Sequence, residues 1–168
     1  MNYAKYVYGD TVNGSGCRVS LYPSGCTMGC VGCFNRAAQD FDYGTLYTEE
    51  FENKIMHDLS GKFIKGLSII GGHALERNNF DTILSLCSRV KKELPDKDIY
   101  LWTGFTLSQV VNHKIYSKIL PVIDVLIDGK FEIENRDINL RFRGSTNQRI
   151  IDVKKSLQNS AESPVLWV

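Results

Sequence analysis

The chain has 168 residues, of which 43% are hydrophobic and 23% are charged, and its formal net charge is +1. A chain of this length can bury a core of its own, and this composition excludes a disordered or fibrous protein, so we expect a single domain over residues 1–168. The near-neutral charge excludes a dominant basic surface, and we expect no direct binding of nucleic acid.

Apolar periodicity predicts alternating strands and helices along the chain. The first predicted strand, residues 19–22, leads into a loop that contains three cysteines. Thr48 is the expected N-cap of a helix that extends to about residue 59, with acidic residues in its first turn. Residues 67–70 form the next predicted strand, and the pair Gly71-Gly72 ends it.

The second half of the chain continues this alternation. A helix is predicted over residues 80–94, with Asp81 in its first turn and Pro95 at its end. The next predicted elements are a strand over 99–103, a weaker helix over 108–120 and an apolar strand over 122–127. Continuous apolar strands that alternate with helices indicate parallel βαβ units.

We therefore predict an α/β fold. A complete (β/α)8 barrel typically needs about 250 residues, so a partial (β/α) barrel of about five or six mostly parallel strands fits this chain better. Ligands of such folds bind where the carboxyl ends of the strands meet the loops. We expect residues 26–33, 71–73, 103–104 and Asp128 to converge on that rim.

The cysteines indicate metal or redox chemistry in a reducing compartment. No apolar run is long enough to cross a bilayer, and the N-terminus lacks a signal-peptide core, so we expect a cytoplasmic protein without membrane contact. Cysteines persist there as thiols, and three of the five are grouped. The two separate cysteines, Cys17 and Cys87, are expected to pack as small apolar side chains.

Cys26, Cys30 and Cys33 follow the spacing C-x3-C-x2-C. Thiolates are the natural ligands of iron-sulfur clusters, and a four-iron cluster held wholly by protein needs four of them. Three thiolates leave one iron open for a substrate or cofactor, as in catalytic metal sites that keep a vacant position. Three glycines would allow the tight turns of this loop: Gly25, Gly29 and Gly32.

A zinc site is the main alternative, because zinc is often held by three cysteines and one histidine. Cys17 or a histidine would then be the fourth ligand. Zinc ribbons usually use two paired C-x-x-C motifs, and the sequence has no second pair. We expect two of the histidines, His57 and His113, to be exposed helix residues.

The cysteine motif, followed by Gly-Gly at the end of the next strand, resembles that of the radical S-adenosylmethionine (SAM) enzymes. Longer segments are similar to the activating proteins of anaerobic ribonucleoside-triphosphate reductase, which are glycyl-radical activases. The similarity covers nearly the whole chain. These segments are MNY at 1–3, VNGSG at 12–16, CFN at 33–35, LWTGF at 101–105, VLIDGKF at 125–131 and RGSTNQ at 143–148.

The resemblance implies a [4Fe-4S] cluster on Cys26, Cys30 and Cys33 whose fourth iron binds SAM. The reduced cluster would cleave SAM to a 5′-deoxyadenosyl radical, which takes a hydrogen from a glycine near the C-terminus of the large subunit of the reductase. The resulting glycyl radical would prime ribonucleotide reduction. The implied partners are therefore that large subunit and an electron donor such as a flavodoxin.

The resemblance also implies which residues contact SAM. Gly32, Cys33 and Phe34 would lie at the adenine region, and the pair Gly71-Gly72 would let the backbone approach the methionine moiety. Alternatively, Phe34 is an ordinary core aromatic without a role in SAM binding, and the glycine pair is only a turn after a strand. Asn35 would brace the loop, or cap a helical segment over 36–39.

His73 departs from the family pattern, which usually has Asp or Glu after the two glycines to receive the SAM ammonium. A neutral imidazole can accept one hydrogen bond, but a charge-assisted bond is roughly twice as strong. The sequence therefore predicts weaker or more pH-dependent SAM binding, improved in His73→Glu, with His73 neutral. Alternatively, His73 faces away and backbone carbonyls receive the ammonium.

Two further residues have open roles. Asp128 either reaches the SAM ribose or the glycyl peptide, or is a turn acid before Gly129. Arg143 either anchors the C-terminal segment or touches the reductase.

The remaining functional alternatives are an activase of another glycyl-radical enzyme, such as pyruvate formate-lyase, and a non-catalytic iron-sulfur or zinc module. The RGSTNQ segment favours the reductase.

Overall fold

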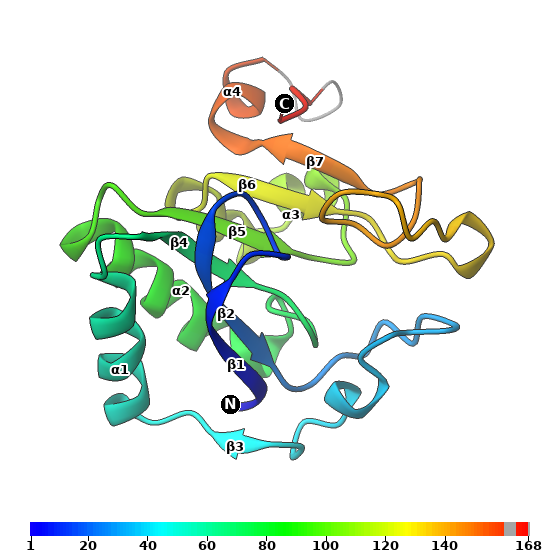
Figure 1. Cartoon of the computed structure of the whole chain (residues 1–168). Helices are drawn as coiled ribbons and strands as arrows, with labels where there is room; N and C mark the ends of the chain where they lie inside the picture. The colour runs from blue at the N-terminus through cyan, green and yellow to red at the C-terminus, as the bar shows by residue number, and fades with distance from the viewer. Residues whose placement is uncertain (160–163, 168) are drawn as a thin grey trace.

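A computed structural model describes residues 1–159 and 164–167. Its centre is one seven-stranded mixed sheet (Figure 1). The four central strands are parallel, and antiparallel strands flank them at both edges. In sheet order the strands are β3 (Thr45–Leu46), β1 (Asn2–Asp10), β2 (Cys17–Pro23), β4 (Ile64–Ile69), β5 (Asp98–Trp102), β6 (Val125–Asp128) and β7 (Arg149–Asp152).

The parallel strands β2, β4, β5 and β6 are the ones that the apolar runs predict, and only their ends differ. The antiparallel strands β1, β3 and β7 are not predicted by those runs. β1 is only partly covered, with Lys5 and Tyr8 exposed, and β3 and β7 have two and four residues. Parallel and antiparallel pairings are equally frequent in this sheet, and the partial barrel stays a prediction.

Two long helices, α1 (Glu49–Leu59) and α2 (Arg77–Glu93), pack against one face of the sheet and bury the main core (Figure 1). Thr48 caps α1 as predicted, because its hydroxyl accepts a hydrogen bond from the Phe51 N–H at 3.2 Å. α2 begins at Arg77 rather than at residue 80, so Asp81 does not lie in its first turn. The residue at its N-cap is Glu76.

The helix predicted over 108–120 is divided in two. α3 (Leu107–Asn112) has His113 as its C-cap, and a 3-10 helix, Tyr116–Val122, follows. The His113 Nδ1 accepts hydrogen bonds from the N–H groups of Ile115 and Tyr116 at 3.3 and 3.2 Å. A side chain that takes these donors competes with the helical pattern and explains the break. The last helix is α4 (Val153–Asn159).

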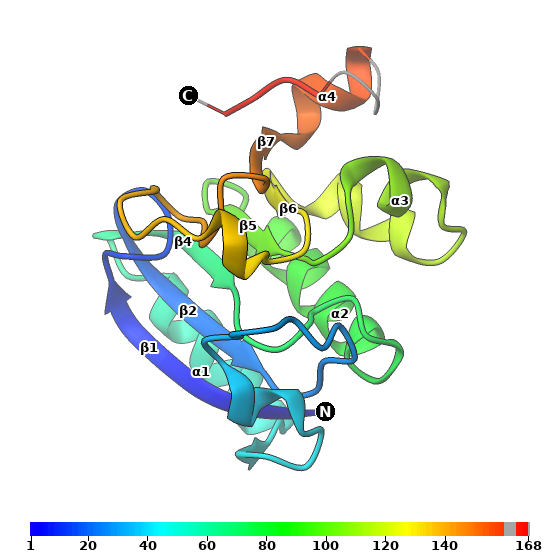
Figure 2. The ribbon, with the colours of Figure 1, turned by 90° about the vertical axis from the view of Figure 1, so that its right-hand side faces the viewer.

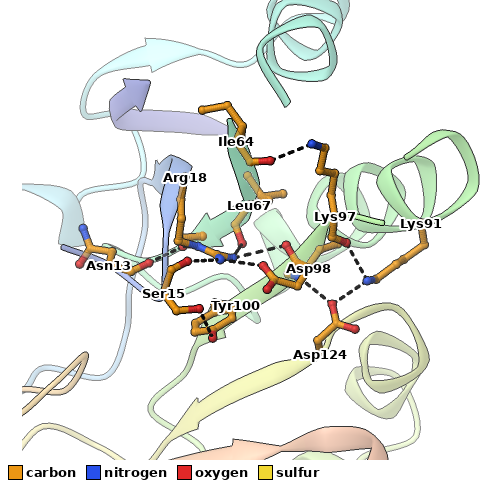
Figure 3. Close-up of polar contacts among 12 residues, drawn as sticks. Asn13, Ser15, Arg18, Ile64, Leu67, Lys91, Lys97, Asp98, Tyr100 and Asp124 are labelled. Atoms are coloured by element: carbon orange, nitrogen blue, oxygen red, sulfur yellow. Dashed lines mark hydrogen bonds and ion pairs between the residues drawn. The ribbon is translucent and has the colours of Figure 1, made fainter. Parts of the chain in front are cut away.

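The opposite face of the sheet contains buried polar residues, and Arg18 on β2 is their centre (Figure 3). Its guanidinium is fully buried, donates to Ser68 Oγ at 2.7 Å and lies 4.1 Å from the centre of the Tyr100 ring. It forms a 2.6 Å ion pair with Asp98 at the start of β5. The ion pair lies at the amino ends of β2 and β5.

Two lysines extend this network along the same edge (Figure 3). Lys97 Nζ donates to the Ile64 carbonyl at 2.7 Å, and Lys91 Nζ donates to the Asp124 carboxylate at 2.6 Å. Charged side chains therefore hold together the loops that enter β4, β5 and β6. The carboxyl ends of these strands, at the opposite edge, remain available for a site. None of the helices described by the structure is long and apolar enough to span a membrane.

Candidate iron-sulfur site

The loops that follow β2 and β6 extend from the same side of the sheet (Figure 1). The first contains the cysteine loop, residues 24–35, and the second contains residues 129–148. Figure 2 turns this side of the molecule toward the viewer and shows both loops at the front. The site lies where the predicted rim of carboxyl strand ends was expected.

Backbone contacts confirm that the predicted segments converge. The Gly72 N–H donates to the Pro23 carbonyl, and the His73 N–H donates to the Gly25 carbonyl, each at 2.9 Å. The ring of His73 lies 2.8 Å from the Thr103 hydroxyl. Asp128 closes the group, because its carboxylate accepts a hydrogen bond from the Leu107 N–H at 2.7 Å.

The first half of the cysteine loop is held tightly by its neighbours. Gly25 N–H donates to the Ala38 carbonyl at 2.8 Å, and Cys26 N–H donates to the Gln39 carbonyl at 3.1 Å. The buried Asn79 of α2 donates its side-chain amide to the Ser24 carbonyl at 2.8 Å. The position of Cys26 is therefore fixed from both sides.

The second half of the loop lines a cleft of about 420 Å³. Cys33 N–H donates to the Cys30 carbonyl at 3.2 Å, which makes a turn between the two thiols. Gly29 and Gly32 have positive φ angles of 58° and 70°, as expected for so tight a loop. The cleft is lined by Gly29, Cys30, Val31, Gly32, Cys33, Arg36 and Gln39.

These residues fit an iron-sulfur cluster. Cys26, Cys30 and Cys33 are all half-buried, and thiolates are the ligands that such clusters use. In residues 1–159 and 164–167, no three acidic, cysteine or histidine side chains are arranged around one metal ion. In a cluster each thiolate binds a different iron, so the thiols need not meet at one point.

The other cysteines lie away from this site, as expected. Cys87 is fully buried in α2, and burial raises the pKa of its thiol to about 12. Cys17 begins β2, and the length of that strand separates it from the cysteine loop by roughly 20 Å at 3.3 Å per residue. The structure therefore contradicts the use of Cys17 as a fourth ligand. His57 is an exposed residue of α1, as predicted. His113 is exposed as predicted, but it follows α3 and is not a helix residue.

Phe34 is 95% exposed, so its alternative as a core aromatic is wrong. The backbone places it at the tip of the cysteine loop, beyond the reach of the core. Asn35 occupies the N-cap position of the 3-10 helix Arg36–Gln39, but its side chain makes no cap hydrogen bond. Its carbonyl accepts instead from the Ala38 N–H at 3.0 Å.

Both ring nitrogens of the buried His73 are engaged. Nδ1 lies 3.3 Å from the Glu76 carboxylate, and Nε2 lies 2.8 Å from the Thr103 hydroxyl. The Thr103 oxygen already accepts from the Phe105 N–H at 3.1 Å, so its own hydrogen can point to Nε2. A neutral imidazole with its hydrogen on Nδ1 satisfies every partner. Neither nitrogen is then free for another ligand.

The pH dependence of stability provides a test of this arrangement. Burial lowers the pKa of His73 below 6.5, although the neighbouring Glu76 acts in the opposite direction. At a pH between the lowered pKa of His73 in the folded chain and its ordinary pKa in the unfolded chain, the unfolded chain binds a proton that the folded chain does not. The free energy of unfolding should therefore fall as the pH drops below about 6.5, by at most about 1.4 kcal/mol per pH unit.

Urea unfolding of the metal-free protein between pH 5 and pH 7 measures this slope. His73→Gln should flatten it, because glutamine does not titrate. His57→Gln, on an exposed residue, should leave it unchanged. An equal slope in wild type and His73→Gln would contradict the neutral buried ring.

Gly72 lies where no side chain fits. A Cβ at this position would be 2.5 Å from the Pro23 carbonyl oxygen and 2.9 Å from that of Gly25. Because both neighbours are backbone atoms at the start of the cysteine loop or just before it, Gly72→Ala should displace that loop. We expect a loss of about 1–3 kcal/mol in the free energy of unfolding, with lower iron content after reconstitution.

Gly61→Ala is the matched control for Gly72→Ala. A Cβ at Gly61 would have its nearest neighbour at 3.2 Å, and this turn follows α1, away from the cysteine loop. Unfolding in urea and iron analysis should detect a smaller change for this variant. Equal losses in the two variants would show that the fit of Gly72 against the loop has no special effect.

Asp128 forms an ion pair with Arg149 that the sequence does not reveal. The Arg149 Nε donates to one carboxylate oxygen at 3.0 Å, and its Nη2 approaches the other at 2.5 Å. With the Leu107 N–H, this pair engages both oxygens of a side chain that is 1% exposed. Asp128 therefore holds Arg149 and the start of α3 together at the rim. Arg143 donates to the Gln148 carbonyl at 2.6 Å, within its own segment.

A second cleft, of about 570 Å³, opens beside this ion pair. Met28 of the cysteine loop and Gly104 lie next to each other in its wall, because a Cβ at Gly104 would be 2.9 Å from the Met28 sulfur. The cleft thus adjoins the cysteine loop. Its other lining residues include Phe105, Asp128, Lys130 and Arg149.

Comparison with known proteins agrees with this site. A family model described as a 4Fe-4S single cluster domain matches residues 12–151, which include all three cysteines of the loop. The class of protein is thus an iron-sulfur domain with one four-iron cluster.

Curated relatives narrow the class further. The chain is 45% identical to a protein of Pasteurella multocida and 47% identical to one of Vibrio cholerae, each over 89% of this chain and 96% and 97% of the relative. It is 39% identical to a protein of Escherichia coli K12, over 88% of this chain and 96% of the relative. All three are named anaerobic ribonucleoside-triphosphate reductase-activating protein. The chain belongs to this family of activating proteins.

Proposed function

We propose that the chain activates the large subunit of an anaerobic ribonucleoside-triphosphate reductase by generating a glycyl radical on it. The observation that carries this proposal is the cysteine loop, which has three half-buried cysteines, two of which, Cys30 and Cys33, line an open cleft. The names of the relatives support the same function. The cofactors would be a [4Fe-4S] cluster and SAM.

Cys26, Cys30 and Cys33 would hold the cluster. When bound and reduced, this cluster supplies the electron that splits SAM and starts the radical chemistry. The chain itself orients the reactants and excludes water. The backbone around Gly72 fixes the Cys26 end of the loop, while Gly32 leaves the wall of the cleft without a side chain.

SAM would lie between the cysteine loop and the glycine turn at 71–72. The turn is partly exposed and has no side chains, so its backbone can approach a ligand closely. The engaged ring of His73 supports a role in fixing this turn, and backbone carbonyls would receive the SAM ammonium. Phe34 is free to cover the adenine because the core does not hold it.

The glycine of the large subunit would enter through the cleft beside Asp128 and Arg149. This cleft adjoins Met28 of the cysteine loop, so a peptide there lies next to the proposed cofactors. We also propose that a one-electron donor such as a flavodoxin approaches the exposed tip of the cysteine loop, at Val31 and Phe34.

Electron paramagnetic resonance tests this function directly. The reconstituted protein is mixed anaerobically with SAM, a reductant and the large reductase subunit, and a glycyl radical signal is expected. Pyruvate formate-lyase in place of the reductase should give no signal. SAM cleavage without a radical on the reductase would indicate another target, and bound zinc without cleavage would indicate a non-catalytic module.

A further inference from the structure

Glu76 stands at the N-cap of α2 but does not cap it. Ser, Thr, Asp and Asn are preferred at this position because a short side chain can reach back to the first N–H groups of the helix. The Glu76 side chain makes no such cap bond. Its longer side chain instead points away from these N–H groups and toward Thr27.

The carboxylate reaches the cysteine loop, 49 residues away in the sequence. One of its oxygens accepts hydrogen bonds from the Thr27 N–H and from the Thr27 hydroxyl, each at 2.8 Å. The same oxygen lies 3.3 Å from the His73 ring. Glu76 thus joins the residue after Cys26 to the residue after the glycine turn.

The charge of Glu76 is poorly screened. Its side chain is 12% exposed, and hydrogen bonds from Thr27 and His73 outweigh the effect of burial and hold its pKa below the usual value, so it is ionised at neutral pH. Among the residues that the structure describes, the basic side chain within 4 Å of its carboxylate is His73, and the neutral ring of His73 does not balance the charge.

A negative charge beside an iron-sulfur cluster makes the cluster harder to reduce and its reduced form a stronger reductant. The reduction potentials of such clusters depend on net charge, on hydrogen bonds to the sulfurs and on exposure. Splitting SAM needs a strong reductant, so a fixed anion near one thiolate favours the proposed reaction. Cys26 is the thiol whose loop segment Glu76 holds.

We propose that Glu76 is a positioning residue that fixes the Cys26 end of the cysteine loop and, through its charge, lowers the reduction potential of the cluster. This inference rests on the proposed position of the cluster at Cys26, Cys30 and Cys33. It requires no direct contact between Glu76 and SAM.

The test is a redox titration of the reconstituted protein without SAM, followed by electron paramagnetic resonance. Glu76→Gln keeps an oxygen that can accept from Thr27 but removes the charge, so its cluster should have a more positive reduction potential than wild type. Glu93→Gln removes the same charge from the exposed end of the same helix, where Glu93 pairs with Arg89. Its potential should equal that of wild type.

Two further variants separate charge from geometry. Glu76→Asp keeps the charge and should have a potential closer to wild type than Glu76→Gln does. Thr27→Val removes one hydrogen bond but leaves the Glu76 charge, so it should shift the potential less than Glu76→Gln. An equal shift in Thr27→Val would assign the effect to loop geometry and overturn the proposal.

The proposal is also overturned if Glu76→Gln and Glu93→Gln have the same potential, or if Glu76→Asp shifts the potential as much as Glu76→Gln does. These measurements need neither SAM nor the reductase. A wild-type protein that holds the cluster but makes no glycyl radical would therefore contradict the proposed function and leave the role of Glu76 standing.

Discussion

Replacing Cys30 by alanine is expected to abolish cluster binding and SAM cleavage. Two thiolates cannot hold a four-iron cluster that already lacks a fourth protein ligand. The loss should exceed the roughly 10- to 100-fold reduction that follows removal of a residue supporting a metal ligand. Iron and sulfide analysis after anaerobic reconstitution measures binding, and the release of 5′-deoxyadenosine measures cleavage.

Cys17→Ala is the matched control for Cys30→Ala. It removes one thiol as well, but from the start of β2, at the far end of the sheet from the cysteine loop. Its iron content and SAM cleavage should match those of wild type. If Cys30→Ala retained a four-iron cluster while Cys17→Ala lost it, the ligand set proposed for the cysteine loop would be wrong.

Replacing Arg18 by methionine is expected to lower the free energy of unfolding by about 3–5 kcal/mol, as when one member of a buried ion pair is removed. The guanidinium is fully buried, and methionine cannot donate to Ser68 or pair with Asp98. Asp98 is 24% exposed, so water can partly replace its partner and the loss should lie near the lower limit. Urea unfolding measures the change.

Arg89→Met provides the comparison. Arg89 pairs with Glu52 and Glu93 on the surface of α2, and its side chain is 30% exposed. Surface pairs of this kind contribute up to about 1 kcal/mol, so this variant should unfold almost as wild type does. If both variants lost the same free energy of unfolding, burial would not explain the contribution of the Arg18 network to stability.

The four parallel strands and the grouping of the three cysteines could be predicted from the sequence because each depends on residues close together in the chain. A strand covered on both faces is a continuous apolar run, which identifies β4, β5 and β6 without reference to their neighbours. The spacing of Cys26, Cys30 and Cys33 places three thiols on one short loop whatever the surrounding fold. Their convergence with the glycine turn followed from the rule for carboxyl strand ends.

The edges of the sheet could not be predicted in this way. β1 contains mostly partly covered and exposed residues in no regular order, and β3 has only two residues, so neither forms an apolar run. The break after α3 depends on the His113 ring, which takes two backbone donors that the helical pattern needs. Apolar periodicity carries no information about such competition.

The sequence alone thus determined the α/β class, the central strands and the grouping of three cysteines on one loop of this protein. Only the tertiary structure decided which partners the buried polar side chains bind. It engaged His73 with Thr103, directed Glu76 to the cysteine loop and paired Asp128 with Arg149. The physical reason is that a buried polar group must find a partner, and distant segments of the chain supply it.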